Sequence, residues 1–198
     1  MKAVNVAVVG ATGAVGEAMI EILESRDFPV DQLFPLASSR SAGKSLRFKG
    51  KRYTVQDLSN FDFSQTPVAL FSAGGDVSAE YAPIAAQQGC VVIDNTSHFR
   101  RDDDIPLVIP EVNPEAIGQF RQRNIIANPN CSTIGMLMAL KPIYDVAGIE
   151  RINVATYQAV SGTGKDAIEE LAGQTARLLN GKEAEPKVYP RQIAFNVI

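Results

Sequence analysis

One cysteine lies where a predicted strand gives way to a predicted helix. Cys131 comes shortly after the apolar run Ile125–Ala127 and shortly before the helical segment 133–146. The N–H groups and the dipole of a helix N-terminus stabilise a thiolate, which is the nucleophilic form of cysteine. Asn130 and Ser132 are also typical capping residues, so a capped helix with an incidental cysteine is the alternative. The residues by themselves leave both interpretations open.

A glycine-rich turn, with Gly10, Gly13 and Gly16, joins the first predicted strand, Val4–Val9, to a helix expected over residues 17–25. In dinucleotide-binding folds one glycine permits a tight turn, and a second lets backbone N–H groups approach a pyrophosphate. The third lets the helix pack closely on the strand. The spacing departs from the commoner Gly-x-Gly-x-x-Gly, but its place between strand and helix predicts a nucleotide site rather than a purely structural turn.

The polar residues after the second predicted strand, residues 32–37, indicate which nucleotide binds. An NAD site usually has Asp or Glu there, which accepts a hydrogen bond from the ribose 2′-hydroxyl. This chain has instead Ser38, Arg40 and Ser41. A guanidinium with neighbouring hydroxyls can bind a 2′-phosphate, which a carboxylate would repel. The sequence therefore favours NADP, and the alternative is a polar loop with a surface arginine.

Strands and helices alternate along most of the chain. Further strands are predicted at residues 67–71 and 90–94, with a helix over residues 77–88 between them. This order predicts an α/β fold with a Rossmann-like, doubly wound parallel sheet, whose ligands bind at the carboxyl ends of the strands. Ser72 and Gly74 follow one strand end and are further candidate cofactor-binding residues. The basic alternation between residues 44 and 56 predicts an exposed hairpin.

The pattern changes after residue 148. Residues 151–160 alternate like a strand with one exposed face, residues 166–179 predict a helix, and residues 183–190 predict a polar connector. An apolar run then begins at residue 192 and continues to residue 198. Because a domain rarely ends inside such a run, we expect this chain to be the front part of a longer protein.

Two other segments offer contacts for an anion or a cofactor. Arg100 and Arg101 could hold a phosphate or a carboxylate, although the acidic residues 102–104 make a surface charge cluster equally reasonable. Ser161 and Gly162 begin a second glycine-rich turn, whose backbone amides could approach the nicotinamide half of a cofactor.

Composition excludes several classes of protein. The 198 residues carry 19 basic and 22 acidic side chains, a net charge of −3, which gives no electrostatic footprint for nucleic acid or an anionic membrane. No apolar run reaches the ~20 residues that span a bilayer, and no secretory signal is visible. With two cysteines, of which Cys90 is expected in the core, we predict a cytoplasmic protein. A single histidine, His98, nearly excludes a metal cluster.

Five motifs occur together and in the order typical of one enzyme family. They are residues 10–16 (GATGAVG), 109–114 (IPEVNP), 128–133 (NPNCST), 156–162 (TYQAVSG) and 192–197 (QIAFNV). Through these motifs the sequence resembles the N-terminal part of aspartate-β-semialdehyde dehydrogenase of the bacterial type. The resemblance covers essentially the whole chain.

The resemblance implies an NADP-dependent interconversion of L-aspartate-4-semialdehyde and phosphate with L-4-aspartyl phosphate, used reductively in lysine, methionine and threonine biosynthesis. It makes Cys131 the nucleophile that forms an acyl-thioester, while Gln158 orients the substrate and Asn130 supports the reacting carbonyl. Arg100 matches the family's phosphate-binding arginine. The matched cofactor positions are Thr12, Gly13, Ala14, Val15, Arg40, Ser41, Ser161 and Gly162.

The resemblance also implies an organisation: an NADP-binding Rossmann-like domain over residues 1–131, the incomplete first part of an α+β catalytic and dimerisation domain over residues 132–198, and a homodimer for the full-length protein. The family's acid/base histidine and substrate-carboxylate arginine would lie beyond residue 198, so we expect this chain alone to be poorly active. The alternatives are an N-acetylglutamyl-phosphate reductase, a non-catalytic NADP-binding fragment and a cysteine hydrolase, for which the chain offers no convincing partner histidine.

Overall fold

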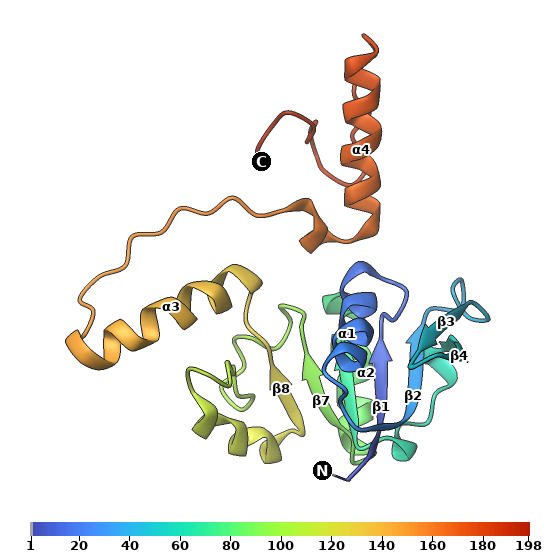
Figure 1. Cartoon of the computed structure of the whole chain (residues 1–198), viewed down its shortest axis with the longest axis vertical. Coiled ribbons are helices and arrows are strands. Elements are labelled where there is room, and N and C mark those ends of the chain that lie inside the picture. The colour runs from blue at the N-terminus through green and yellow to red at the C-terminus, as the bar shows by residue number, and fades with distance from the viewer. Residues whose placement is uncertain (1) are drawn as a thin grey trace. The chain divides into compact units, whose positions relative to one another are not determined.

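A six-stranded sheet forms the centre of the first part of the chain (Figure 1). The computed structural model describes residues 2–198. The strands are β1 Val4–Val9, β2 Val30–Ala37, β3 Ser45–Phe48, β4 Lys51–Thr54, β5 Gln56–Asp57, β6 Val68–Phe71, β7 Val91–Asp94 and β8 Ile125–Ala127. The α-helices are α1 Ala14–Ser25, α2 Gly75–Gln87, α3 Cys131–Ala147 and α4 Lys165–Leu179. The 3-10 helices are η1 Leu58–Asn60, η2 Phe63–Gln65, η3 Pro114–Gln122 and η4 Val160–Thr163.

Every strand pair in the large sheet is parallel, in the order β5-β2-β1-β6-β7-β8, so the predicted doubly wound sheet is confirmed. Val9 at the end of β1 pairs with Leu36 of β2 and with Phe71 at the end of β6. Phe71 in turn pairs with Asp94, and Asp94 with Ala127. The register therefore brings the carboxyl ends of these strands to one edge. The strand order reverses beside β1, where such sheets bind their ligands.

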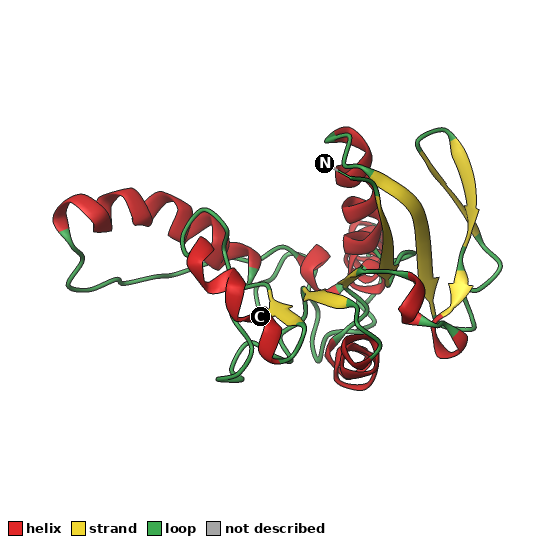
Figure 2. Ribbon diagram, turned by 90° about the horizontal axis from the view of Figure 1, so that it is seen from below, coloured by secondary structure: helices red, strands yellow, loops and turns green. Residues whose placement is uncertain are grey.

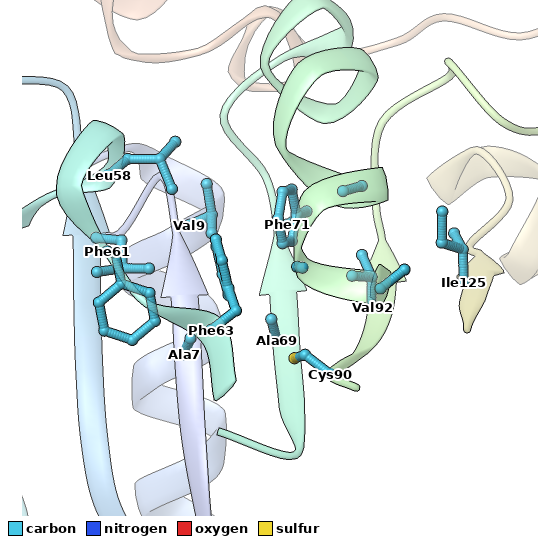
Figure 3. Packing of buried hydrophobic residues seen from close by; sticks show 14 of the residues in the cluster. Ala7, Val9, Leu58, Phe61, Phe63, Ala69, Phe71, Cys90, Val92 and Ile125 are labelled. Atoms are coloured by element: carbon cyan, nitrogen blue, oxygen red, sulfur yellow. The ribbon is translucent and has the colours of Figure 1, made fainter. Parts of the chain in front are cut away.

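Apolar side chains cover both faces of this sheet. Alternation along β1 directs Ala7 and Val9 to one face and Val6 and Val8 to the other. The first face packs against α2 and against aromatic residues of the η1–η2 connection, such as Phe63 (Figure 3). The second packs against α1 and β3. Parallel sheets need cover on both faces, which explains why their strands read as continuous apolar runs.

The basic hairpin predicted between residues 44 and 56 is confirmed as the antiparallel pair β3 and β4. It forms a small sheet of its own and lies beyond β2 (Figures 1 and 2). Phe48 points into the core, while the basic side chains of Arg47, Lys51 and Arg52 are exposed. The alternation of residue types along the hairpin therefore reflects one buried and one solvated side.

The chain divides into two compact units, of which the first ends at Ile152 and the second is Asn153–Ile198. The predicted helix near the C-terminus is confirmed as α4, but the strand predicted at residues 151–160 is wrong, because residues 151–159 have no regular structure. An extended segment becomes a strand only by hydrogen bonding to a neighbouring strand, and residues 153–198 contain none. The functional boundary after Cys131 stays a prediction.

Two polar side chains of α4 hold the following segment along the helix. The Glu170 carboxylate accepts hydrogen bonds from the backbone N–H groups of residues 187–189, at 2.9 Å for Lys187. Gln174, which is 2% exposed, accepts from the N–H groups of Ile193 and Ala194 at 2.9 and 3.1 Å. These bonds replace the strand ladder that this segment lacks.

The carboxylate of Glu170 should make this part of the structure sensitive to acid. Desolvation raises the pKa of Glu170, but the N–H donors of residues 187–189 and the charge of Lys187 together lower it below its ordinary value of 4.5. A depressed folded-state pKa means that the stabilisation is complete above that ordinary value and is lost as the pH falls through the folded-state pKa.

We therefore expect Glu170→Gln to speed hydrogen exchange of the amides at residues 187–189 at neutral pH. The ratio of the variant's rate to the wild-type rate should fall toward one below pH 4.5. Hydrogen exchange followed by mass spectrometry measures both. Glu169→Gln, next to it on the exposed side of α4, is the control and should leave these amides unchanged.

Candidate functional site

The turn after β1 is shaped by its glycines. Gly10 has a φ of +86°, and a Cβ added there would lie 2.9 Å from the backbone nitrogen of Ala73. A Cβ at Gly16 would lie 2.1 Å from the carbonyl oxygen of Gly10. Gly13 is the N-cap of α1, and no side chain caps that helix. The backbone therefore forms the close-packed strand–turn–helix cradle that fits a pyrophosphate.

The half-buried residues Thr12, Ala14 and Val15 belong to this turn or to the first residues of α1. The turn after β6 lies beside it, because Ser72 donates from both its N–H group and its hydroxyl to the carbonyl of Val9, at 2.9 and 3.0 Å. Gly74 follows at a φ of +105° and opens α2, with open space where a Cβ would be. The candidate cofactor residues of these two turns are thus neighbours.

The loop after β2 carries the candidate phosphate-binding residues. The N–H group of Ser41 donates to the carbonyl of Ser38 at 2.8 Å, which turns the chain so that Arg40 is exposed. The ammonium of Lys44 donates to the Ser41 hydroxyl at 3.4 Å. Two cations and three serine hydroxyls in one loop suit a phosphate group. Sequence reasoning identified Arg40 but missed Lys44, because Lys44 belongs to the segment leading into the hairpin.

Cys131 is the first residue of α3, two residues earlier than the predicted helix start, and its side chain is exposed. The Asn130 side chain caps the helix by accepting from the N–H group of Ser132 at 3.1 Å. The helix is therefore capped by Asn130 and not by Cys131, whose thiol is accessible at the helix N-terminus. An exposed cysteine at a helix N-terminus is a typical position for a reactive cysteine.

Cys90 provides the contrast within the same unit. Its side chain is fully buried in the core beside β6 (Figure 3), as predicted. Burial raises the pKa of the Cys90 thiol to about 12. At neutral pH this thiol is therefore protonated and unreactive.

Arg100 is anchored where β7 and β8 end. Its guanidinium donates from Nε to the carbonyl of Asn128 at 2.9 Å and from Nη2 to the carbonyl of Asn95 at 3.1 Å. Asn128 Nδ2 also donates to Asn95 Oδ1 at 2.5 Å. A guanidinium has five N–H donors, so a group held in this way can still bind an anion. Sequence reasoning did not identify Asn95 and Asn128, although both directly follow predicted strands.

The remaining candidates belong to the second unit. Gln158 lies in the stretch without regular structure, and Ser161 and Gly162 lie in η4. Their roles stay predictions. Within residues 2–198 no three His, Cys, Asp or Glu side chains are placed to hold a metal ion. Over the same residues, no helix combines the length and the apolar character needed to cross a membrane.

Comparison with known proteins extends these observations. Residues 5–120 match the family described as semialdehyde dehydrogenase, NAD binding domain, and residues 140–198 match its dimerisation domain. An aspartate-semialdehyde dehydrogenase of Shewanella violacea is 70% identical over 194 residues, which are 98% of this chain and 57% of that protein. A crystal structure of aspartate semialdehyde dehydrogenase II from Vibrio cholerae, complexed with ASA, has a TM-score of 0.96 at 68% identity, over 99% of this chain and 58% of that one.

A more distant structure is that of aspartate semialdehyde dehydrogenase with NADP from Candida albicans, with a TM-score of 0.66 at 29% identity over 75% of this chain and 48% of that one. The sheet, with its glycine turn beside the topological reversal, defines a Rossmann-like α/β protein. With the family match over residues 5–120, the chain belongs to the semialdehyde dehydrogenase family. It spans a little over half the length of the Shewanella and Vibrio relatives described above.

Proposed function

We propose that this chain is the cofactor-binding and nucleophile-bearing part of an NADP-dependent aspartate-semialdehyde dehydrogenase. The reaction interconverts L-aspartate-4-semialdehyde, phosphate and NADP⁺ with L-4-aspartyl phosphate and NADPH, in lysine, methionine and threonine biosynthesis. One observation carries the proposal: the exposed Cys131 opens a helix at the sheet edge that also holds the glycine turn. The names of the relatives specify the substrate.

The residues of the chain supply the steps around the reacting carbon. The thiolate of Cys131 adds to the aldehyde carbon, and after oxidation the substrate is held on the sulfur as a thioester. When bound, NADP⁺ supplies the acceptor for the hydride. Arg100 holds phosphate, whose oxygen attacks the thioester carbon, and the thiolate of Cys131 leaves. Asn130 supports the reacting carbonyl, and Gln158 orients the substrate.

The fit to NADP rests on the backbone cradle and on the loop after β2. The cradle is closed to any side chain at Gly10 and Gly16, and α1 begins there without a side-chain cap. The cofactor contacts are proposed at Gly10, Thr12, Gly13, Ala14, Val15, Ser38, Arg40, Ser41, Ser72, Gly74, Ser161 and Gly162. Arg40 has no acidic neighbour in its Ser-Ser-Arg-Ser run. That charge pattern favours the 2′-phosphate of NADP over the free hydroxyl of NAD.

Arg40→Ala is expected to weaken NADPH binding by about 10- to 100-fold, the effect of losing hydrogen bonds to a charged group, and to leave NADH binding nearly unchanged. The fluorescence of the reduced nicotinamide measures both dissociation constants directly, without turnover. Arg47→Ala removes an exposed cation from the neighbouring hairpin and serves as the control. An equal loss for both nucleotides would contradict the assignment of Arg40 to the 2′-phosphate.

Three further parts of the proposal concern the whole protein. The match of residues 140–198 to a dimerisation domain supports a homodimer. We place the functional boundary after Cys131, so that the nucleophile joins the cofactor half to the catalytic half. Both cysteines are free, which agrees with a reducing cytoplasm.

The test is NADPH formation from L-aspartate-4-semialdehyde and NADP⁺, measured with and without phosphate on the protein that carries this sequence. Turnover that requires phosphate supports the proposal. Equal turnover without phosphate would point to a hydrolytic aldehyde dehydrogenase. Activity with the longer N-acetylglutamate semialdehyde, and none with the aspartyl substrate, would move the chain to the related reductase.

A further inference from the structure

The segments that carry Cys131 and Arg100 are joined at the tips of two neighbouring strands. We propose that Asn95 is a positioning residue for Cys131 and that it acts through Asn128. The inference rests on the proposed role of Cys131 as the nucleophile. Its structural basis is the side-chain hydrogen bond of 2.5 Å from Asn128 Nδ2 to Asn95 Oδ1, which links the residue after β7 to the residue after β8.

Asn128 is held by three of its polar groups. Its N–H group donates to the carbonyl of Asp94 at 2.8 Å, its side chain donates to Asn95, and its carbonyl accepts from Nε of Arg100 at 2.9 Å. The backbone bond to Asp94 continues the pairing of β7 with β8, but the side-chain bond does not belong to the sheet. Asn95 therefore holds the side chain of Asn128 one residue beyond the last paired residues of β7 and β8.

Little freedom remains between Asn128 and the thiol. Pro129 comes next and is buried, and its ring fixes its φ angle. Asn130 then caps α3 through Ser132, and Cys131 is the first helical residue. We therefore expect a displacement of Asn128 to reach the first turn of α3, because Pro129 and Asn130 leave few torsions free to absorb it.

Asn95 itself stands on a rigid base. Its N–H group donates to the carbonyl of Phe71 at 2.9 Å. The preceding carboxylate, Asp94, is fully buried and accepts from the Ser78 hydroxyl at 2.7 Å and from the N–H group and hydroxyl of Thr96 at 3.1 and 2.7 Å. The end of β7 is therefore tied to α2, and Asn95 transmits that fixed position to the segment before Cys131.

The consequence concerns the chemistry of the thiol. A thiolate at a helix N-terminus is stabilised only while the first-turn N–H groups point at it, and the effect falls off within that turn. Releasing Asn128 loosens the entry to α3 and the alignment of the Cys131 thiol with those N–H groups. Cys131 is already exposed, so loosening the segment adds little to its accessibility.

Two substitutions of Asn95 separate the hydrogen bond from other effects of changing this side chain. Asn95→Asp keeps an oxygen that accepts from Asn128 Nδ2, whereas Asn95→Leu has nearly the same size and can neither accept nor donate. The negative charge of Asn95→Asp disfavours a nearby thiolate, so it works against the expected difference and cannot produce it. The readout is the second-order rate of Cys131 alkylation by iodoacetamide on this chain, with peptide mass spectrometry to identify the modified thiol.

At pH 7.5 we expect Asn95→Leu to alkylate about two- to fivefold more slowly than Asn95→Asp, as the loss of a helix-terminus interaction predicts. At about pH 10, where ordinary thiols are largely ionised, the two rates should converge. Asn128→Leu removes the donor instead of the acceptor and should behave like Asn95→Leu. It keeps the test decisive if Asn95→Leu does not fold.

Asn5→Ala is the matched control, because it breaks a hydrogen bond of 2.8 Å to the carbonyl of Gln65 at the opposite edge of the sheet. It should leave the alkylation rate unchanged. Equal rates for Asn95→Leu and Asn95→Asp, or a difference that persists at high pH, would overturn the positioning role. Alkylation needs neither substrate nor cofactor, so this test gives a clear answer whether or not the chain turns over. The proposed function fails separately, if the protein that carries this sequence shows no phosphate-dependent turnover.

Discussion

Replacing Cys131 with alanine is expected to lower the rate of phosphate-dependent NADPH formation by about four orders of magnitude or more, the usual effect of deleting a covalent nucleophile. The thiol of Cys131 would hold the substrate through oxidation and phosphate attack, and no other group at the exposed start of α3 can replace it. The measurement is the initial rate at saturating substrate, on the protein that carries this sequence. NADPH binding should be unchanged, because alanine removes only the sulfur.

Cys90→Ala is the matched control for this prediction. That side chain lies in the core and is fully buried, so its replacement should cost about 1 kcal/mol of stability and leave the rate nearly unchanged. The folded fraction of each variant is measured by circular dichroism before the assay. Turnover that survives in Cys131→Ala would show that the exposed thiol is incidental and that Asn130 simply caps a helix.

Those features of the fold that depend on local sequence could be predicted. Val4–Val9 is recognisable as a buried strand because its last four residues are apolar on both faces. Gly10 ends it, because the backbone there adopts a positive φ. The expected start of the first helix at residue 17 is three residues later than its observed start at Ala14. Gly13 and Gly16 made residues 14–16 look like part of the turn, because glycine is rare inside helices. In the structure, Gly16 belongs to the helix.

Features that depend on pairing between distant segments could not be predicted in the same way. The bond between Asn95 and Asn128 exists only because β7 and β8 are neighbours in the sheet, 33 residues apart in the chain. The alternation over residues 151–160 indicates a surface with one apolar side, but a strand also needs a partner. In residues 153–198 the hydrogen bonds go instead to side chains of α4, such as Gln174.

Gly16→Ala is expected to destabilise the first unit by about 3 kcal/mol, at the upper end of the usual cost of overpacking. A Cβ at this position would lie 2.1 Å from the carbonyl oxygen of Gly10 and 2.9 Å from the Cα of Ala11. Both atoms belong to the backbone of the turn, so neither can move aside as a flexible side chain would. Relief requires α1 to move away from the end of β1, which would also open the cradle proposed for the pyrophosphate.

Urea unfolding followed by circular dichroism measures the free energy of unfolding. The fluorescence of NADPH measures the affinity of the turn for the nucleotide. Gly13→Ala should cost less, because its Cβ would lie 3.3 Å from the same oxygen. Gly135→Ala, within α3 and with open space around it, should stabilise the chain by about 0.5–1 kcal/mol. If Gly16→Ala unfolds at the same urea concentration as Gly135→Ala and binds NADPH normally, then close helix–strand approach does not shape this turn. In that case Gly13 and Gly16 do not have the separate roles that the dinucleotide-binding turn assigns to them.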